Sequence, residues 1–357
     1  MKKILITGAG SFIGTSFENY IKNHPKRADY EISVMDTFTG RVVKKDAESD
    51  KSKDAKAEAK TDSGSSAKSD ADSNAGDAVK KDDVSCTING TDIKEAEAWN
   101  FKGYDVIFHV AGIAHADVGK VSEEGKELYR KVNTELTVET AKKAKEAGVK
   151  QFIFMSSAIV YGASSKIGER KEITKDTKPS PENFYGESKL NAEIGLKELD
   201  DDNFRVVILR PPMIYGPGCK GNYNSLRKFA IKLPLFPKVK NERSMLFTDN
   251  LCEFVRLMTD NEERGIFHPA NKEKSNTSEM VKMIASAHGK NLKLVGGFTW
   301  LLKILSAFTG LVNKAFGSLT YADEITRYKD DYNVTGLEES IILTEKCMTG
   351  NEQLNRR

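Results

Sequence analysis

The N-terminal segment up to about Ile21 constrains the fold most strongly. Residues 3 to 7 are an apolar run that predicts a short buried strand, and an apolar periodicity typical of a helix follows. A turn joins the two, and its residues include Gly8, Gly10, Ser11, Phe12, Ile13 and Gly14. A turn without bulky side chains lets backbone N–H groups and a helix N-terminus approach a pyrophosphate. We therefore predict a nucleotide-binding unit, with a merely tight strand-to-helix turn as the alternative.

The glycine spacing departs from both common dinucleotide-binding patterns. Ile13 stands where Gly-x-Gly-x-x-Gly has its third glycine, and Ser11 stands where Gly-x-x-Gly-x-x-Gly has its second. The position of the turn between a strand and a helix therefore supports the prediction more than the spacing does.

Strand-like and helix-like segments alternate along the chain to about residue 217. Further strands are expected at about 31–35, 84–88, 105–110, 151–156 and 205–209, and helices at 122–147 and 183–199. This alternation predicts an α/β fold with a Rossmann-type, doubly wound parallel sheet in residues 1–217. Residues 218–357 are expected to form mainly a smaller C-terminal α/β substrate domain, with about 245–262 returning to the first domain.

Residues 44–83 differ from the rest of the chain in composition. They consist largely of Lys, Asp, Ser and Ala with almost no large apolar side chain. Such a segment cannot offset its ordering entropy by burial. We predict a disordered insertion here, with a regulatory or partner-binding tail as the alternative.

Charge and cysteine usage exclude several classes of protein. The formal net charge is +3 from 55 basic and 52 acidic residues, without a dense basic block, so binding to nucleic acid is disfavoured. The four cysteines and five histidines are scattered, so neither a disulfide framework nor a metal site is predicted. Reduced thiols fit the cytoplasm.

The sequence also argues against targeting to or through a membrane. The apolar stretch after Met1 is far too short for a signal peptide. Residues Phe298 to Phe316 are apolar with a helical period, but Lys303, Asn313 and Lys314 interrupt them, so they cannot span a bilayer. We expect a buried or dimer-forming helix there in preference to a membrane-surface helix.

The ends of the predicted strands supply candidate contacts for a dinucleotide. Asp36 ends the second strand, where its carboxylate can accept hydrogen bonds from ribose hydroxyls and would repel a 2′-phosphate. This favours NAD over NADP, although Arg41 lies just downstream. The remaining candidates, each of which is otherwise an ordinary strand end, are Asp92 and Ile93 for the adenine and Val110, Ala111 and Gly112 beside the cofactor.

A tyrosine and a lysine at helical spacing form the candidate catalytic pair. Tyr185 and Lys189 are four residues apart, so they share one helix face, where the ammonium is expected to stabilise a phenolate and lower the tyrosine pKa. Ser156 and Ser157 follow a predicted strand and can hydrogen-bond the tyrosine oxygen. Asn133, in a separate helix, is expected to orient the lysine through a water. Alone, the pair is weak evidence, and a solvated helix face is then the preferred interpretation.

The order of these parts resembles the short-chain dehydrogenase/reductase family, in its extended, nucleotide-sugar-modifying branch. The resemblance covers the whole chain except the insertion. It is carried by residues 7–14, by Phe152-Ile153-Phe154-Met155-Ser156-Ser157-Ala158-Ile159-Val160-Tyr161-Gly162, by Tyr185-Gly186-Glu187-Ser188-Lys189, and by Arg210-Pro211-Pro212-Met213-Ile214-Tyr215-Gly216-Pro217-Gly218.

The resemblance implies a tightly held NAD and a Ser157, Tyr185 and Lys189 triad. The triad would remove a substrate hydroxyl proton while hydride passes to the nicotinamide, giving a ketosugar. Further implied contacts are Asn133 and Pro211 with the cofactor, Arg243 with the substrate diphosphate, and Asn222 and Thr320 with the substrate. A homodimer through the helices at 122–147 and 183–199 and a role in cell-surface polysaccharide supply are implied too.

Two residues after the catalytic serine bear on the reaction. The 4,6-dehydratases of this branch carry an acidic pair there, whereas Ala158 and Ile159 cannot exchange a proton. The Ser-Ser-Ala-x-Val-Tyr-Gly form resembles the 4-epimerases, which pass through a transient 4-keto sugar. The sequence therefore favours an NAD-dependent nucleotide-sugar 4-epimerase such as those acting on UDP-glucose.

Two alternatives remain open. The stretch from Arg210 to Ser244 resembles NAD(P)H-dependent 4-ketoreductases of 4-keto-6-deoxy nucleotide sugars, and Met213 replaces an asparagine that contacts the phosphates in many epimerases. The other alternative is a non-catalytic NAD-binding regulatory module, against which the intact Ser157, Tyr185 and Lys189 argue.

Overall fold

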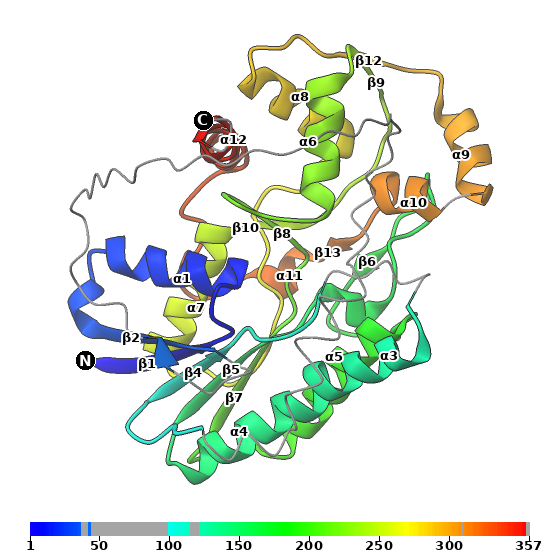
Figure 1. Cartoon of the computed structure of the whole chain (residues 1–357). Coiled ribbons are helices and arrows are strands. Elements are labelled where there is room, and N and C mark those ends of the chain that lie inside the picture. Colours follow the sequence, from blue (N-terminus) through cyan, green and yellow to red (C-terminus); the bar gives the residue numbers. More distant parts are fainter. Residues whose placement is uncertain (37–41, 44–98, 115–120, 309, 355–357) are drawn as a thin grey trace, which may run out of the picture.

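A seven-stranded sheet forms the centre of the protein (Figure 1). The computed structural model describes residues 1–36, 42–43, 99–114, 121–308 and 310–354. The strand order is β11-β7-β5-β4-β1-β2-β3, and all neighbouring strands are parallel except β2 and β3. The strands are β1 (Lys2–Thr7), β2 (Tyr30–Met35), β3 (Val42–Val43), β4 (Val106–His109), β5 (Gln151–Met155), β7 (Arg205–Leu209) and β11 (Gly265–Phe267).

This topology confirms the predicted Rossmann-type doubly wound sheet. The expected strand at 84–88, the insertion at 44–83 and the adenine candidates Asp92 and Ile93 lie outside the described residues.

Helices cover both faces of the sheet because its strands are apolar on both sides. Helices α1 (Phe12–Asn23) and α7 (Thr248–Asp260) lie on one face, and α4 (Leu136–Glu146) and α5 (Phe184–Lys197) lie on the other (Figure 1). Each face of the sheet forms a hydrophobic core with its helices. Within β1, the side chains of Ile4 and Ile6 belong to the core under α1 and α7, and Leu5 belongs to the core under α4 and α5. This alternation is the period-two pattern of a strand.

The helix expected at 122–147 is formed in three parts. Helix α3 (Glu123–Tyr129) is capped by the Ser122 side chain, which accepts a hydrogen bond from the N–H of Gly125. A π-helical segment, Arg130–Glu135, joins it to α4. A π turn adds a residue to the helical repeat and often occurs at functional sites, and this one contains the candidate residue Asn133.

The C-terminal part adds a smaller α/β layer beside the carboxyl edge of the main sheet (Figure 1). Its core joins residues such as Tyr223, Phe236, Met280, Ile284 and Phe316. Three short parallel pairs belong to this side: β8 (Met213–Tyr215) with β10 (Met245–Phe247), β9 (Leu235–Pro237) with β12 (Lys293–Val295), and β6 (Glu172–Ile173) with β13 (Thr320–Tyr321). Its helices are α6 (Asn222–Lys232), α8 (Thr277–Ala287), α9 (Thr299–Phe308), α10 (Gly310–Phe316), α11 (Asp323–Thr326) and α12 (Leu337–Leu354).

The apolar run at 298–316 forms two helices, α9 and α10. Phe316 belongs to the core, whereas most of the described side chains of α9 are exposed in the single chain, so for α9 only the dimer-forming part of the expectation stays as a prediction. Leu302 packs partly against the core, whereas the side chains around it are exposed. None of the helices in the described part of the chain combines the length and the apolar character that crossing a bilayer requires.

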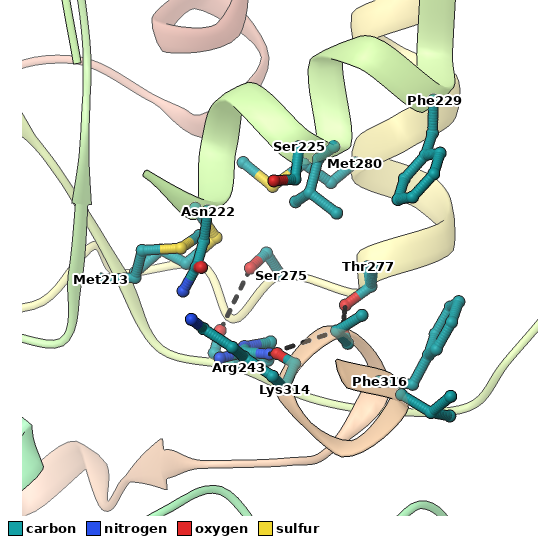
Figure 2. A pocket seen from close by; sticks show the side chains of 14 residues that line it. Met213, Asn222, Ser225, Phe229, Arg243, Ser275, Thr277, Met280, Lys314 and Phe316 are labelled. Carbon is teal, nitrogen blue, oxygen red and sulfur yellow. Dashed lines mark hydrogen bonds between the residues drawn. The ribbon is translucent and has the colours of Figure 1, made fainter. Parts of the chain in front are cut away.

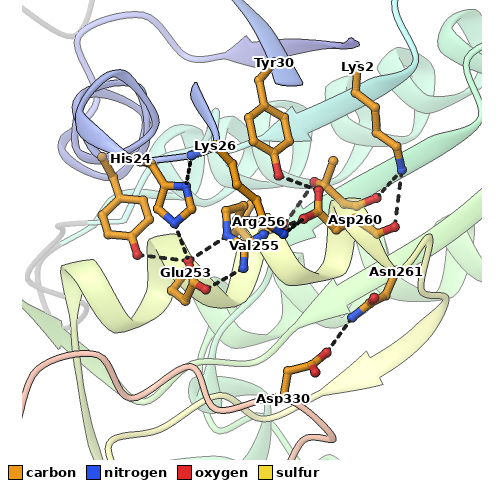
Figure 3. A network of polar contacts seen from close by, with 12 residues as sticks. Lys2, His24, Lys26, Tyr30, Glu253, Val255, Arg256, Asp260, Asn261 and Asp330 are labelled. Carbon is orange, nitrogen blue, oxygen red and sulfur yellow. Dashed lines mark hydrogen bonds and ion pairs between the residues drawn. The ribbon is translucent and has the colours of Figure 1, made fainter. Parts of the chain in front are cut away.

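The chain returns to the main sheet through β10, α7 and β11, and a polar network holds α7 in place (Figure 3). The Nε of Arg256 donates to Glu253 over 2.7 Å, and the same guanidinium contacts Asp260. The phenol of Tyr30 on β2 donates to Asp260 over 2.5 Å, and the ammonium of Lys2 on β1 donates to the Thr259 carbonyl oxygen over 2.7 Å. This network ties a helix from the C-terminal half to the first two strands.

Candidate cofactor and catalytic site

The turn after β1 is built tightly against the end of β4. Gly8 has a φ of +95°, and a Cβ there would lie 3.0 Å from the backbone nitrogen of Ala111. A Cβ on Gly14 would lie 3.1 Å from the side chain of Ile6 and 3.2 Å from that of Val110. Both positions therefore require glycine, because any side chain would separate the turn and α1 from the sheet.

The same turn leaves room where a ligand would approach. Gly10 has a φ of +73°, and a Cβ there would meet no atom within 4 Å. Ser11 caps α1 by accepting a hydrogen bond from the N–H of Gly14 over 3.2 Å. Phe12 packs against the core of the smaller layer and Ile13 against that of the sheet. The uncovered backbone at Gly10 and the N-terminus of α1 can therefore accommodate a pyrophosphate.

The predicted ribose contact lies beside this turn. Asp36 directly follows β2, and the Met35 carbonyl oxygen accepts hydrogen bonds from the N–H groups of Gly8 and Ala9 over 3.0 and 3.1 Å. Val110 and Ala111 follow β4 on the other side of β1. The carboxyl ends of these adjacent strands thus gather the sequence-predicted cofactor residues that the structure describes.

Tyr185 is the second residue of α5 and is partly buried. Burial raises its pKa to about 12, and a hydrogen bond with the Ser157 side chain opposes that rise. This differs from the expectation that Lys189 lowers the tyrosine pKa. The physical reason is that the Lys189 ammonium donates to the Met155 carbonyl oxygen, over 2.9 Å, so desolvation dominates at the phenol.

Lys189 is buried among apolar groups and the end of β5. Its ammonium lies 4.8 Å from the centre of the Phe154 ring. Burial lowers its pKa to about 8, and the carboxylate of Glu193, one turn further along α5, acts in the opposite direction. A lysine with this pKa can exchange a proton near neutral pH.

Asn133 connects the end of β4 to α5. Its side-chain oxygen accepts from the N–H of Ile113 over 2.8 Å, and its amide donates to the Ile113 carbonyl and to the Ser188 hydroxyl, each over 3.1 Å. A Cβ on Gly112 would lie 2.9 Å from that side-chain oxygen and 3.2 Å from the Lys189 ammonium. Asn133 therefore fixes the backbone beside Lys189 through protein groups, and its water-mediated contact with the lysine stays a prediction.

Two buried polar groups were missed from the sequence. His109 on β4 contacts the hydroxyls of Thr7, over 2.8 Å, and Thr137, over 3.0 Å. Burial and then the charge of Lys189 lower its pKa to about 3, so it is neutral near pH 7. Its position at the end of an apolar strand was the only available signal.

Glu193 is the second missed group, and it links the serine pair to a buried arginine. It accepts from the Ser156 hydroxyl over 2.5 Å and from two nitrogens of Arg210. Arg210 in turn donates to the Tyr161 phenol over 2.6 Å. The spacing of four residues between Lys189 and Glu193 could have signalled that the two side chains share one face of the helix.

A cavity of about 390 Å³ lies in the smaller layer and contains Arg243 and Asn222, both predicted as substrate contacts (Figure 2). Arg243 donates to the Lys314 carbonyl oxygen over 2.7 Å, and burial lowers its pKa. In the described parts of the chain, its guanidinium forms no ion pair with a carboxylate. Met213, Met280, Val312 and Phe316 supply an apolar wall.

Two predicted residues lie elsewhere. Thr320 is buried in β13 and does not line the cavity, and its N–H donates to the Lys171 carbonyl oxygen. The carbonyl oxygen of Pro211 accepts from the N–H of Ala158 over 2.9 Å, which holds the loop after β7 against the segment after Ser157. Two residues further on, Met213 lines the cavity, so this loop connects the sheet edge to it.

Sequence and structure comparisons agree on the class of protein. The model of the NAD dependent epimerase/dehydratase family matches residues 4–268, so the chain belongs to that family. A Vibrio cholerae protein named UDP-glucose 4-epimerase is 30% identical over 333 residues, which are 91% of this chain and 85% of that protein. An Escherichia coli O157:H7 protein named N-acetyl-alpha-D-glucosaminyl-diphospho-ditrans,octacis-undecaprenol 4-epimerase is 28% identical over 61% of this chain and 68% of its own length.

Solved structures share the fold across almost the whole chain. UDP-glucuronic acid 4-epimerase from Bacillus cereus, in complex with NAD, has a TM-score of 0.62 at 16% identity and covers 98% of this chain and 99% of its own. A dTDP-4-dehydrorhamnose reductase from Clostridium acetobutylicum has a TM-score of 0.63 at 17% identity over the same shares.

The protein is therefore an enzyme of an NAD-dependent family, and NAD is its cofactor, as the sequence predicted. The residues fit this cofactor, since Gly8 and Gly14 hold a tight turn and Gly10 leaves its outer side open.

Proposed function

We propose that the protein is a nucleotide-sugar 4-epimerase that acts through a transient 4-keto sugar. The single observation that carries this is that the Ser157 hydroxyl lies close enough to the Tyr185 phenol to act on its pKa, with Lys189 one turn along the same helix at the end of β5. Ala158 and Ile159 follow the serine and offer no acid group for an elimination. The two relatives named as 4-epimerases support the same reaction.

In this mechanism Tyr185 accepts the proton of the sugar C4 hydroxyl and later returns it. Ser157 hydrogen-bonds the phenol and positions the sugar hydroxyl beside it. Lys189, with a pKa of about 8, donates to the Met155 carbonyl oxygen here, and its proposed role is to turn towards the phenolate and stabilise it once NAD and the sugar are bound. NAD, when bound, supplies the acceptor and donor of the hydride at C4. Asn133 and Gly112 keep the backbone close to Lys189.

Arg243 is proposed to bind the diphosphate of the substrate. A partly buried guanidinium without a carboxylate partner in the described residues suits a ligand with two or more negative charges, and its fork geometry matches phosphate oxygens. Asn222 lies in the same cavity and adds a neutral hydrogen-bonding group. Asp36 is proposed to hold the adenosine ribose and to exclude a 2′-phosphate.

A 4-ketoreductase of a 4-keto-6-deoxy nucleotide sugar is the second candidate. Met213, which replaces the asparagine of many epimerases, lines the same cavity as Arg243 and Asn222 (Figure 2). A methionine there removes a polar contact with the phosphates, which favours this alternative. A non-catalytic NAD-binding module would tolerate the loss of Tyr185 without any change in turnover.

A homodimer through α3, α4 and α5 is part of the proposal. Ile194 on α5 is an exposed apolar side chain on this layer, where a second copy would cover it. Sedimentation equilibrium of the parent and of Ile194→Glu tests it, because a dimer through this layer predicts a monomeric variant.

A substrate with deuterium at C4 tests the proposed route. An epimerase with a transient 4-keto sugar returns the same hydride, so the product keeps its deuterium without added cofactor. Loss of the label to solvent would contradict hydride return, and consumption of NAD(P)H on a 4-keto-6-deoxy sugar would assign the reductase.

A further inference from the structure

The outer face of α9 exposes large apolar side chains to solvent. Trp300 is 63% exposed and Ile304 is 50% exposed. We call this surface the α9 face, and it consists of Phe298, Trp300, Leu301, Ile304 and Leu305. The helix lies at the outer edge of the smaller layer, away from the main sheet (Figure 1). Exposed apolar clusters of this kind mark interaction surfaces.

The segment that carries the α9 face has charged side chains of one sign. From Met280 to Ala322 the sequence contains no Asp or Glu. It contains five lysines, all exposed, and none of them forms an ion pair within the described residues: Lys282, Lys290, Lys293, Lys303 and Lys314. The Lys303 stem passes the Gly168 loop, where a Cβ would lie 3.0 Å from its Cε. The α9 face therefore lies in a segment whose only charged side chains are lysines, and the adjoining Gly168 loop carries Lys166 and Arg170 beside one acidic residue, Glu169.

We propose that the α9 face docks the protein on an anionic phospholipid surface. An amphipathic helix with Trp, Phe and Leu on one side and lysines around it lies in the plane of a bilayer, where its apolar side chains enter the headgroup boundary. The lysines are attracted by anionic headgroups. A second copy of the chain is a poorer partner, because pairing the face with itself would oppose one set of lysines to another.

Docking in this way bears on the site. Helix α10 follows α9 directly, and its Val312, Lys314 and Phe316 line the cavity that holds Arg243. A sugar diphosphate bound there would lie beside the headgroup layer. The inference does not depend on whether the reaction is epimerisation or ketone reduction.

The test measures binding of the full-length protein to vesicles. The parent protein is sedimented with vesicles of phosphatidylcholine alone and with vesicles that also contain phosphatidylglycerol. We expect co-sedimentation with the anionic vesicles only, weakened by salt, and about tenfold weaker binding for Ile304→Glu and for Lys303→Glu. Val334→Glu is the matched control, because Val334 is equally exposed, at 51%, and lies outside the basic segment.

Tryptophan fluorescence gives a second readout. The chain has two tryptophans, and Trp99 is buried at 8% exposure, so a vesicle-induced blue shift reports Trp300. The proposal is contradicted if the parent stays in the supernatant with anionic vesicles, or if Ile304→Glu binds as the parent does. A parent that forms dimers lost in Ile304→Glu, without binding vesicles, would show that a second copy covers the face.

Discussion

The ammonium of Lys189 and the carboxylate of Glu193 lie one helical turn apart on α5, and the carboxylate partly offsets the desolvation that lowers the lysine pKa to about 8. Glu193 is also fully buried and paired with Arg210. One side chain thus tunes the candidate catalytic lysine and supports the core beneath the serine pair.

Replacing Glu193 by glutamine is expected to move the pH dependence of turnover. Without the carboxylate, the Lys189 pKa falls further below 8, so the ammonium is lost at lower pH and the alkaline limb of kcat shifts towards acid. The variant also leaves Arg210 without its ion pair, which costs about 3–5 kcal/mol of unfolding free energy. An alkaline limb at the parental pH would show that Lys189 does not control it.

Gly112→Ala is expected to lower kcat by about tenfold or more, because a 1 Å displacement in a catalytic group has effects of this size. The new Cβ would lie 2.9 Å from Asn133 and 3.2 Å from the Lys189 ammonium, so one of them must move. Gly336→Ala is the matched control, since its Cβ would lie at an ordinary contact distance of 3.6 Å from Oε1 of Glu273. Steady-state kinetics of both variants checks this, and equal kcat values would contradict it.

Arg243→Met separates binding from stability. The partly buried guanidinium has no carboxylate partner among the described residues, so its removal is expected to change the unfolding free energy by less than about 1 kcal/mol. If it binds the diphosphate, KM rises by about tenfold to a hundredfold, since charge-assisted hydrogen bonds contribute about 1.5–3 kcal/mol. Urea unfolding and substrate titration measure the two effects. An unchanged KM would remove Arg243 from the substrate site.

His109 is expected to make stability depend on pH. Its folded pKa of about 3 lies below its ordinary value of 6.5, so between these two pH values the unfolded state binds more protons than the folded state. The free energy of unfolding therefore falls as the pH is lowered from about 6.5 towards 3. The loss is about 2 kcal/mol between pH 6.5 and about pH 5. His109→Gln should lose this component in urea titrations at the two pH values. An identical slope in the variant would contradict the assignment.

Local patterns were sufficient to predict the parts of the fold that local physics determines. The apolar run before Gly8 and the helical period after Ser11 predicted β1 and α1, and the spacing of Tyr185 and Lys189 predicted their shared helix face. Gly14 lets α1 pack closely against Ile6 and Val110. Ile6 is near it in the sequence, but Val110 is not, so this requirement for glycine could be predicted only in part.

Long-range contacts explain what the sequence did not predict. The pKa of Tyr185 depends on where the Lys189 ammonium points, and it points at Met155 on another element. The cavity combines Asn222, Arg243 and Phe316 from three separate segments, and no spacing along the chain links them. Thr320 resembled a pocket residue by sequence, but its strand pairing with β6 places it outside the cavity lining.

The central claim is tested most directly by incubating the purified protein, without added cofactor, with UDP-glucose and with UDP-N-acetylglucosamine, and following the anomeric protons by NMR. The account predicts that the 4-epimer of one substrate appears with the parent protein and that Tyr185→Phe, folded by circular dichroism, is slower by about 10²–10⁴. Equal turnover by the parent and the variant would contradict the account. It would also be contradicted if neither sugar reacted and the protein instead consumed NAD(P)H on a 4-keto-6-deoxy nucleotide sugar.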